Sequence, residues 1–221
     1  LGESWARRLT REGAVLDAAP DLYDIAFVLY ALAWRYKLTS EPEVRARMHA
    51  TLAFVRKHMR AGEGFWHGLP PVGPRLQNPH MHLLEATLAA FRACGDERYL
   101  DQASEIVGLF QRRFFDGRTL GEFFTSDLAR AAGEEGRLVE PGHQFEWAWL
   151  LAQYQAIPGL GVDFSEAASA LVAFGERFGV NAKTQATHDE VRDDGAPLRT
   201  SSRAWPNTER IKGHLGLFEL T

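Results

Sequence analysis

The sequence predicts an all-α protein built from repeated helical hairpins. Two observations predict this fold class: apolar residues that follow the helical period, and an acidic residue that recurs near the start of each first helix of a pair. The acidic residues are separated by 61, 61 and 63 positions: Asp24, Glu85, Glu146 and Glu209. This interval, with every long loop at the same end, is typical of an αα solenoid or a closed α/α toroid.

The first half of the chain contains two predicted hairpins. Residues 21–38 place apolar side chains on one helical face, and Pro20 and Asp21 stand where a helix would start. Further helices are predicted over 42–59, 79–93 and 97–115, with a Gly- and Pro-rich loop over 61–78 and a break at Cys94-Gly95-Asp96.

The second half repeats the arrangement. A loop with a short hairpin is predicted over 116–141, and a second long loop over 180–204. Helices are predicted over 142–155 and 164–178, on either side of the Ile157-Pro158-Gly159 break, and Pro206 is expected to open a last helix at its first position.

Composition narrows the classes of function. Apolar residues make up 45% of the chain, charged residues 24%, and the formal charge is −4, without the basic stripe that nucleic acids or membrane surfaces attract. The lone Cys94 excludes an internal disulfide and a cysteine-built zinc site, and we expect it to be a buried, inert thiol. No apolar run approaches the length of a membrane helix, so we expect a cytoplasmic protein.

Two helix starts carry the motif His-x-x-Glu: His82 with Glu85, and His143 with Glu146. Residues three apart share one face of a helix. A carboxylate beside an imidazole can fix its tautomer and raise its basicity, which suits a general base. Trp205 adds an indole near Glu209, the fourth of the recurring acidic residues, and an aromatic face beside carboxylates is typical of a sugar-binding surface.

Each of these signals has a structural alternative. Acidic residues near helix starts also complement the helix dipole, and a single histidine there is more often a cap or a surface group. His80 and His82 point to different sides of a helix, which argues against a joint metal site. A metal bound by His82, His143 and nearby carboxylates has no recognised ligand spacing, so we predict none.

Four strings resemble the N-acylglucosamine 2-epimerase family, which includes mannose isomerases and cellobiose 2-epimerases. The resemblance implies an (α/α)6 barrel, a toroid of helical hairpins, and 1–221 would then be a single partial domain. Six hairpins at this interval need roughly 370 residues, so the chain would be the middle portion of a longer protein, without its N- and C-terminal repeats. The strings span 21–24, 78–85, 140–147 and 205–209.

The resemblance also implies a mechanism. One of two histidines, His143, would exchange a proton at C2 of an open-chain sugar through an enediolate, supported by Glu146, without metal or organic cofactor. Return of the proton to C2 gives the epimer, and its return to C1 gives the ketose. The second histidine and an upstream arginine have no match in this chain. The residues expected to line or close the sugar site are Tyr23, Asn78, His82, Trp205 and Glu209.

Other functions and several substrates stay open at this point. A glycoside hydrolase would use paired carboxylates, and a non-catalytic sugar-binding or regulatory module would use none of this chemistry. Among substrates, a mannose-type sugar is favoured over N-acylglucosamine, mannose 6-phosphate or a disaccharide. Arg199 and Arg203 are candidates for holding a phosphate, although solvated surface charge is the favoured interpretation. We expect no nucleic-acid or membrane partner, and a homodimer as the assembly.

Overall fold

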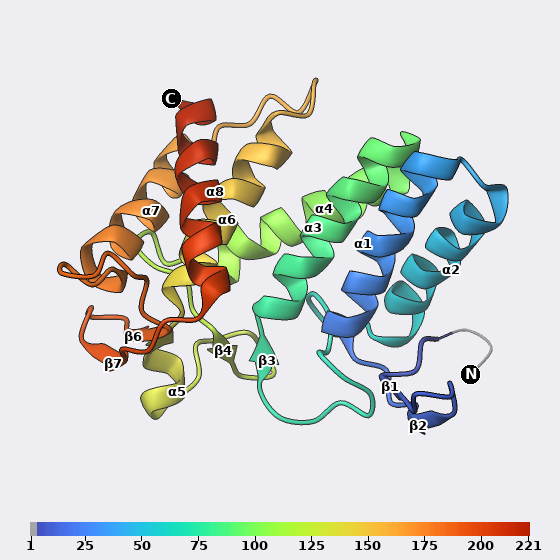
Figure 1. Ribbon diagram of the computed structural model, residues 1–221, viewed down its shortest axis with the longest axis horizontal. Coiled ribbons are helices and arrows are strands. Elements are labelled where there is room, and N and C mark those ends of the chain that lie inside the picture. Colours follow the sequence, from blue (N-terminus) through green and yellow to red (C-terminus); the bar gives the residue numbers. More distant parts are fainter. Residues whose placement is uncertain (1–3) are drawn as a thin grey trace. The chain divides into compact units, whose positions relative to one another are not determined.

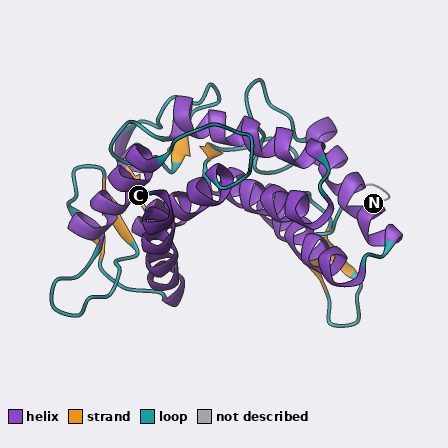
Figure 2. Ribbon diagram, turned by 90° about the horizontal axis from the view of Figure 1, so that it is seen from above, coloured by secondary structure: helices purple, strands orange, loops and turns teal. Residues whose placement is uncertain are grey.

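The computed structural model describes residues 4–221, whose regular structure is mostly helical, which confirms the all-α fold class (Figure 1). Helices dominate, and the strands between them are only two or three residues long (Figure 2). Two compact units divide the chain: unit 1 runs to residue 109 and includes 126–128, and unit 2 contains 110–125 and 129–221.

Unit 1 consists of two helical hairpins. The first helices of the two hairpins, α1 and α3, pack against each other, and each also packs against the helix that follows it (Figure 1). The helices are α1 (Leu22–Thr39), α2 (Pro42–His58), α3 (Asn78–Cys94) and α4 (Glu97–Leu109); the strands are the antiparallel pair β1 (Arg8–Leu9) and β2 (Val15–Asp17), and β3 (Arg75–Leu76).

The start of α1 is fixed as the sequence predicts. Asp21 caps the helix: its Oδ1 accepts hydrogen bonds from the backbone N–H groups of Tyr23 at 3.0 Å and Asp24 at 3.3 Å. One face of the helix is then buried, including Leu22, Ile25 and Leu29. The cap therefore fixes where α1 begins, and with it the positions of Tyr23 and Asp24 in the first turn.

Unit 2 is built around α6 (Pro141–Gln155), against which both α7 (Ser165–Gly179) and α8 (Ala204–Leu220) pack (Figure 1). An antiparallel three-stranded sheet, β5-β6-β7, lies beside α7 and buries Val139 and Val191 against Phe174. The remaining elements are a π-helical turn (Phe110–Phe114), β4 (Phe123–Phe124), α5 (Gly133–Arg137), β5 (Leu138–Val139), β6 (Glu190–Arg192) and β7 (Pro197–Arg199).

Helix α6 is buried on almost every side, and 12 of its 15 residues are buried. Its close neighbour α8 meets it through small residues. A Cβ at Gly213 would come within 2.8 Å of the Phe145 backbone oxygen, and one at Gly216 within 3.0 Å of the Trp149 Cα. These glycines allow the two helix backbones to approach, which places the first turns of α6 and α8 side by side.

The predicted helices are confirmed to within about two residues at most ends, and the differences have local causes. The predicted helix over 97–115 ends as a π-helical turn, and α8 begins at Ala204 rather than at Pro206. The loops predicted over 116–141 and 180–204 contain α5 and the β6–β7 hairpin, elements too short to show a period.

Cys94 is half-buried rather than buried, and its Sγ donates to the Ala90 carbonyl. Within residues 4–221, no helix is long and apolar enough to cross a membrane.

His80 acts as an internal link between α3 and the loop before it. Its Nε2 accepts a hydrogen bond from the Phe65 backbone N–H at 2.9 Å, and its Nδ1 donates to the Leu76 carbonyl at 2.8 Å. Burial lowers the pKa of His80 to about 4, although the bond to Leu76 acts in the opposite direction. The ring is therefore neutral in the folded protein at physiological pH.

This buried histidine predicts a specific dependence of stability on pH. The pKa is lower folded than unfolded, so His80 stabilises the protein above about pH 6.5, and this contribution falls as the pH drops toward 4. Relative to His80→Gln, which cannot titrate, the wild type should lose about 2 kcal/mol more unfolding free energy between pH 7 and pH 5. Urea denaturation at both pH values measures this difference, and parallel losses in the two proteins would contradict it.

Candidate active site

In unit 2, a buried histidine and a buried glutamate form an ion pair at the start of α6. His143 lies in the first turn, and its Nδ1 is 3.0 Å from Oε2 of Glu122, with both side chains less than 5% exposed. The other oxygen of Glu122 accepts the backbone N–H of Glu140 at 3.2 Å. One carboxylate therefore binds both the imidazole and the backbone residue that precedes the helix.

A second layer of charges surrounds this pair. Glu140 accepts a hydrogen bond from Arg203 at 2.9 Å, and Arg203 also bonds to Asp189 at 3.0 Å. Asp189 is itself buried and accepts from Ser201 at 2.7 Å. Because these contacts join the segment before α8 to the start of α6, they hold the two helix starts together.

The electrostatics of the site favour the protonated imidazole. Burial lowers the pKa of His143, but the charge and hydrogen bond of Glu122, followed by the charges of Glu140 and Glu146, outweigh it and raise the pKa to about 9. Burial also raises the pKa of Glu140, against the opposing charge of His143. At neutral pH His143 is therefore an imidazolium with acidic neighbours.

The first turn of α8 provides an aromatic wall beside this imidazole. The Trp205 ring lies with its centroid 5.2 Å from that of His143, at an interplanar angle of 33°. The Arg203 guanidinium lies over the same indole at 5.2 Å. One turn further along α8, Glu209 is mostly buried and pairs with Lys212 at 2.7 Å.

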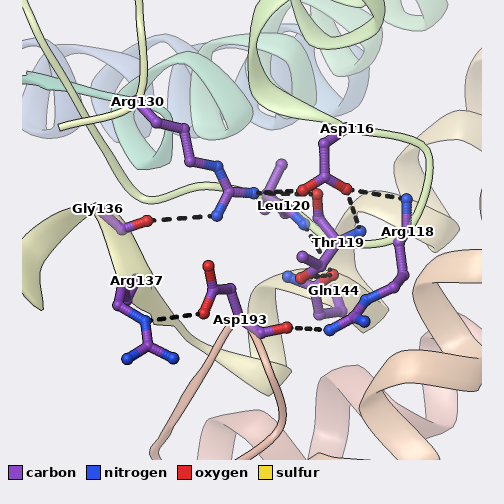
Figure 3. Close-up of polar contacts among 9 residues, drawn as sticks. All are labelled: Asp116, Arg118, Thr119, Leu120, Arg130, Gly136, Arg137, Gln144 and Asp193. Carbon is purple, nitrogen blue, oxygen red and sulfur yellow. Dashed lines mark hydrogen bonds and ion pairs between the residues drawn. The ribbon is translucent and has the colours of Figure 1, made fainter. Parts of the chain in front are cut away.

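The loop that carries Glu122 is fixed by several polar contacts (Figure 3). Gln144, next to His143 on α6, accepts the Leu120 backbone N–H at 3.1 Å. Arg130 bonds to the Asp116 carboxylate at 3.2 Å, to the Thr119 carbonyl at 3.3 Å and to the Gly136 carbonyl at 3.3 Å. The loop is thus fastened to α6 and to itself on the side of Glu122.

In unit 1, a second group of predicted site residues lies together around His82. The imidazole packs edge-on against Tyr23, with centroids 4.9 Å apart, and against Phe27 at 4.7 Å. Its Nδ1 lies 3.4 Å from Glu85, as the His-x-x-Glu spacing predicts. Helices α1 and α3 therefore present an aromatic and acidic cluster at their first turns.

A hollow of about 390 Å³ opens beside this cluster and is lined in part by Tyr23 and Asn78. Arg7 lies at its edge, 3.6 Å from Asp24 and 3.9 Å from Asp21. The Asn78 Oδ1 is buried and has no hydrogen-bond partner among residues 4–221. An unpaired buried carbonyl oxygen is costly, which is typical of a position that accepts from a ligand hydroxyl.

Comparison with known proteins places the chain in a family. The sequence profile of the family described as N-acylglucosamine 2-epimerase (GlcNAc 2-epimerase) matches residues 2–221. The chain belongs to this family. The resemblance noted from four short strings is therefore confirmed over nearly the whole chain.

Individual relatives within the N-acylglucosamine 2-epimerase family are isomerases. The chain is 36% identical over 219 residues to the mannose-6-phosphate isomerase of Rhizobium meliloti strain 1021, covering 95% of this chain and 56% of that protein. It is 28% identical over 176 residues to the D-mannose isomerase of Thermobifida fusca, covering 70% and 42%. The chain thus spans about half the length of these curated relatives.

A solved structure supports the architecture. The crystal structure of a D-mannose isomerase superposes with a TM-score of 0.83 at 20% identity, over 97% of this chain and 62% of that one. At this identity the likeness concerns the fold alone. The fold is that of the (α/α)6-barrel epimerases, as the resemblance implied.

The structure groups the predicted site residues of this family member by unit. Tyr23 contacts His82 in unit 1, and Asn78 lines the hollow beside Tyr23. In unit 2, the Trp205 ring packs at a tilt against His143, while Glu146 is buried on α6 and Glu209 lies further along α8. The functional roles of these residues stay predictions.

Sequence analysis missed Glu122, which makes the hydrogen bond to His143. This glutamate precedes β4 in a loop and belongs to no repeated motif. The available signal was weak: a single acidic residue enclosed by the apolar and small residues of Leu120-Gly121-Glu122-Phe123-Phe124. A charge in such a segment is buried only if it has a partner, and the partner lies 21 residues away.

The two arginines considered for phosphate binding are paired with carboxylates. Arg203 bonds to Glu140 and Asp189, and Arg199 lies 3.1 Å from Glu190. This pairing favours the interpretation that neither holds a phosphate.

The ligand atoms of Glu122, Glu140 and His143 lie within 4.8 Å of one another, a spacing that suits a metal ion as well as it suits hydrogen bonds. That no metal is needed stays a prediction.

The close approach of Trp205 to α6 predicts a sensitive position. A Cβ at Gly142 would lie 2.4 Å from the Trp205 ring and 3.1 Å from the Pro206 Cα. Gly142→Ala should therefore displace the indole and reduce the free energy of unfolding by about 1–3 kcal/mol. Denaturation followed by tryptophan fluorescence measures both effects. The matched control is Gly62→Ala, whose Cβ meets no atom within 4 Å, and equal behaviour of the two variants would contradict the prediction.

Proposed function

We propose that the protein containing this chain is a sugar 2-epimerase or aldose–ketose isomerase, in which His143 exchanges a proton with an open-chain sugar. The observation that carries the proposal is the buried His143–Glu122 pair, set beside the indole of Trp205. A buried imidazole with several acidic neighbours has the surroundings that a proton-transfer group needs. Membership in the N-acylglucosamine 2-epimerase family supports the same chemistry.

The proposed reaction breaks the C2–H bond of the open-chain aldose. A base takes the proton, and the electron pair of the bond moves into a C1–C2 double bond, so that negative charge develops on O1 of an enediolate. His143 is protonated at neutral pH, because its pKa is raised to about 9, and it therefore serves first as the acid. A group on the opposite face takes the C2 proton. His143 then donates its proton to C2, which restores the C1 aldehyde and gives the epimer, or to C1, in which case the O2 proton moves to O1 and the C2 ketone of the ketose forms.

The other predicted residues would hold the sugar. The Trp205 indole offers a face on which sugar C–H groups can stack, and Tyr23 offers a second aromatic ring on unit 1. Asn78, whose buried Oδ1 has no partner in the described part of the chain, would accept a hydrogen bond from a sugar hydroxyl. Glu146 would support His143 through its charge, and His82 and Glu209 would contact hydroxyl groups. Each contact orients the substrate rather than taking part in bond breaking.

Among substrates, we propose a mannose-type monosaccharide. Two relatives are named as isomerases of mannose or mannose 6-phosphate, which favours this sugar over N-acylglucosamine. Arg199 and Arg203 are each paired with carboxylates, which supports the unphosphorylated sugar over the phosphorylated one. A panel of mannose, mannose 6-phosphate, N-acylglucosamine and cellobiose discriminates among these substrates.

Proton NMR of these sugars in D₂O, with the whole protein, tests the proposed chemistry. Deuterium should appear at C2 of the substrate, and His143→Gln should slow this exchange about 10²–10⁴-fold, because the variant lacks the imidazolium whose charge stabilises the enediolate and whose proton completes the reaction. The matched control is His58→Gln, at the C-terminal end of α2, which should leave the rate unchanged. A rate that survives in His143→Gln would contradict the proposal. Glycoside cleavage without exchange would favour the hydrolase alternative.

Chelation tests the expected independence from metal. Since Nδ1 of His143 is already bonded to Glu122, and Glu140 to Arg203, we expect these groups to act without a cation. Dialysis against EDTA should therefore leave the rate of C2 exchange within about twofold of the untreated protein. A loss that added Mn²⁺ or Zn²⁺ restores would instead assign a metal to the group formed by Glu122, Glu140 and His143.

A further inference from the structure

We propose that Glu122 is the positioning residue of the proton-transfer histidine: its carboxylate holds Nδ1 of His143 and thereby assigns proton exchange with the sugar to Nε2. The catalytic role of Glu122 rests on the proposed function, because it requires that His143 transfers a proton. Glu122 lies outside every motif of the sequence analysis. The geometry, however, can be tested without any activity.

The hydrogen bond between the two side chains determines the tautomer. An ionised carboxylate can only accept, so the nitrogen 3.0 Å from Glu122 must carry a proton in both the neutral and the charged ring. The proton that His143 gains and loses is then the one on Nε2. With both side chains less than 5% exposed, water competes little for this bond.

Glu122 is itself held in place from two sides. Its second oxygen accepts the Glu140 backbone N–H at 3.2 Å, so the carboxylate bridges the imidazole and the start of α6. On the other side, the Gln144 carboxamide oxygen accepts the Leu120 N–H at 3.1 Å, which ties the loop to α6 two residues before Glu122. The carboxylate is therefore fixed relative to the helix that carries His143.

Packing at the preceding residue keeps the loop in this position. A Cβ at Gly121 would lie 2.8 Å from both the Phe124 ring and the Arg130 Nε, so the backbone is enclosed there. Arg130 in turn bonds to Asp116 and to the carbonyl groups of Thr119 and Gly136 (Figure 3). A carboxylate on such a segment has little freedom to leave the imidazole.

Several charged side chains in unit 2 raise the pKa of His143, and among them Glu122 also makes a hydrogen bond to the imidazole. Glu140 precedes α6 and is paired with Arg203, and Glu146 lies on α6; both act on the imidazole through their charge. The neighbouring side chain of α8 is the uncharged Trp205. Burial lowers the pKa of His143, and the charge and hydrogen bond of Glu122 are the largest influences that raise it to about 9. Replacement of Glu122 by a neutral group should therefore lower this pKa.

The variant Glu122→Gln tests the inference, because an amide has one acceptor oxygen where the carboxylate has two. Its NH₂ group would face either the Nδ1–H of His143 or the Glu140 N–H, so one of these two bonds is lost. We expect kcat to fall between about 10- and 10⁴-fold, with KM within about threefold. The basic limb of the pH profile should move down by at least about one pH unit, a shift that a merely structural role would not produce. Glu122→Asp, which keeps the charge on a shorter stem, should lose less activity.

Nitrogen-15 NMR of histidine-labelled whole protein gives the readout that is independent of activity, with His143→Gln to assign the signal. In the wild type, Nδ1 should stay protonated while Nε2 titrates with a midpoint near pH 9, and in Glu122→Gln the midpoint should fall. Glu134→Gln is the matched control, an exposed glutamate paired with Arg192, and should change neither signal nor rate. Circular dichroism verifies folding of each variant.

The outcomes separate the two proposals. A wild-type His143 whose neutral ring carries its proton on Nε2 overturns the inference, even if Glu122→Gln does not fold. An unchanged midpoint and pH profile in a folded Glu122→Gln overturn it as well. The protein could also show a proton on Nδ1 and a shifted midpoint but exchange no C2 proton of any sugar. That result would support the role of Glu122 in holding the ring and refute the proposed function.

Discussion

The buried hydrogen bond between His143 and Glu122 is the constraint on which the rest of unit 2 depends. Two charged side chains without water are costly unless each is paired and further bonded. The surroundings provide these bonds. The backbone N–H of Glu140 meets the second oxygen of Glu122, and Arg203 balances the charge of Glu140. The polar contacts at the start of α6 therefore keep the buried imidazole of His143 protonated although it has little contact with solvent.

Close helix packing complements these polar contacts. Gly213 and Gly216 let α8 approach α6, and Gly142 leaves room for the Trp205 ring. A larger residue at any of these positions would separate the indole from His143. The arrangement of aromatic and acid–base groups is therefore a result of helix spacing as much as of hydrogen bonding, and small residues set that spacing.

Periodicity and the repeated acidic residues predicted the helices well, because an amphipathic helix of four turns leaves a clear pattern. The site could be predicted only in part. His143 and Trp205 stand in short motifs, and the structure brings them together. Glu122 could not be found, because its partner is far away in sequence and its own segment has no period. The raised pKa of His143 depends on carboxylates from separate segments, which only the tertiary structure assembles. The strands β5 to β7, two or three residues each, are likewise too short to alternate visibly.

The pairing of Arg203 has a consequence for what the site can accept. The charged groups gathered here include the carboxylates of Glu122, Glu140, Glu146 and Asp189, and the cations of Arg203 and the imidazolium. Negative charge is in excess, and the guanidinium is already used by two of the carboxylates. An anionic group close to the imidazole would therefore be repelled by these carboxylates. Under the proposed function, a substrate with an acidic substituent would have to direct that group away from the imidazole, whereas a neutral sugar would meet no such electrostatic barrier.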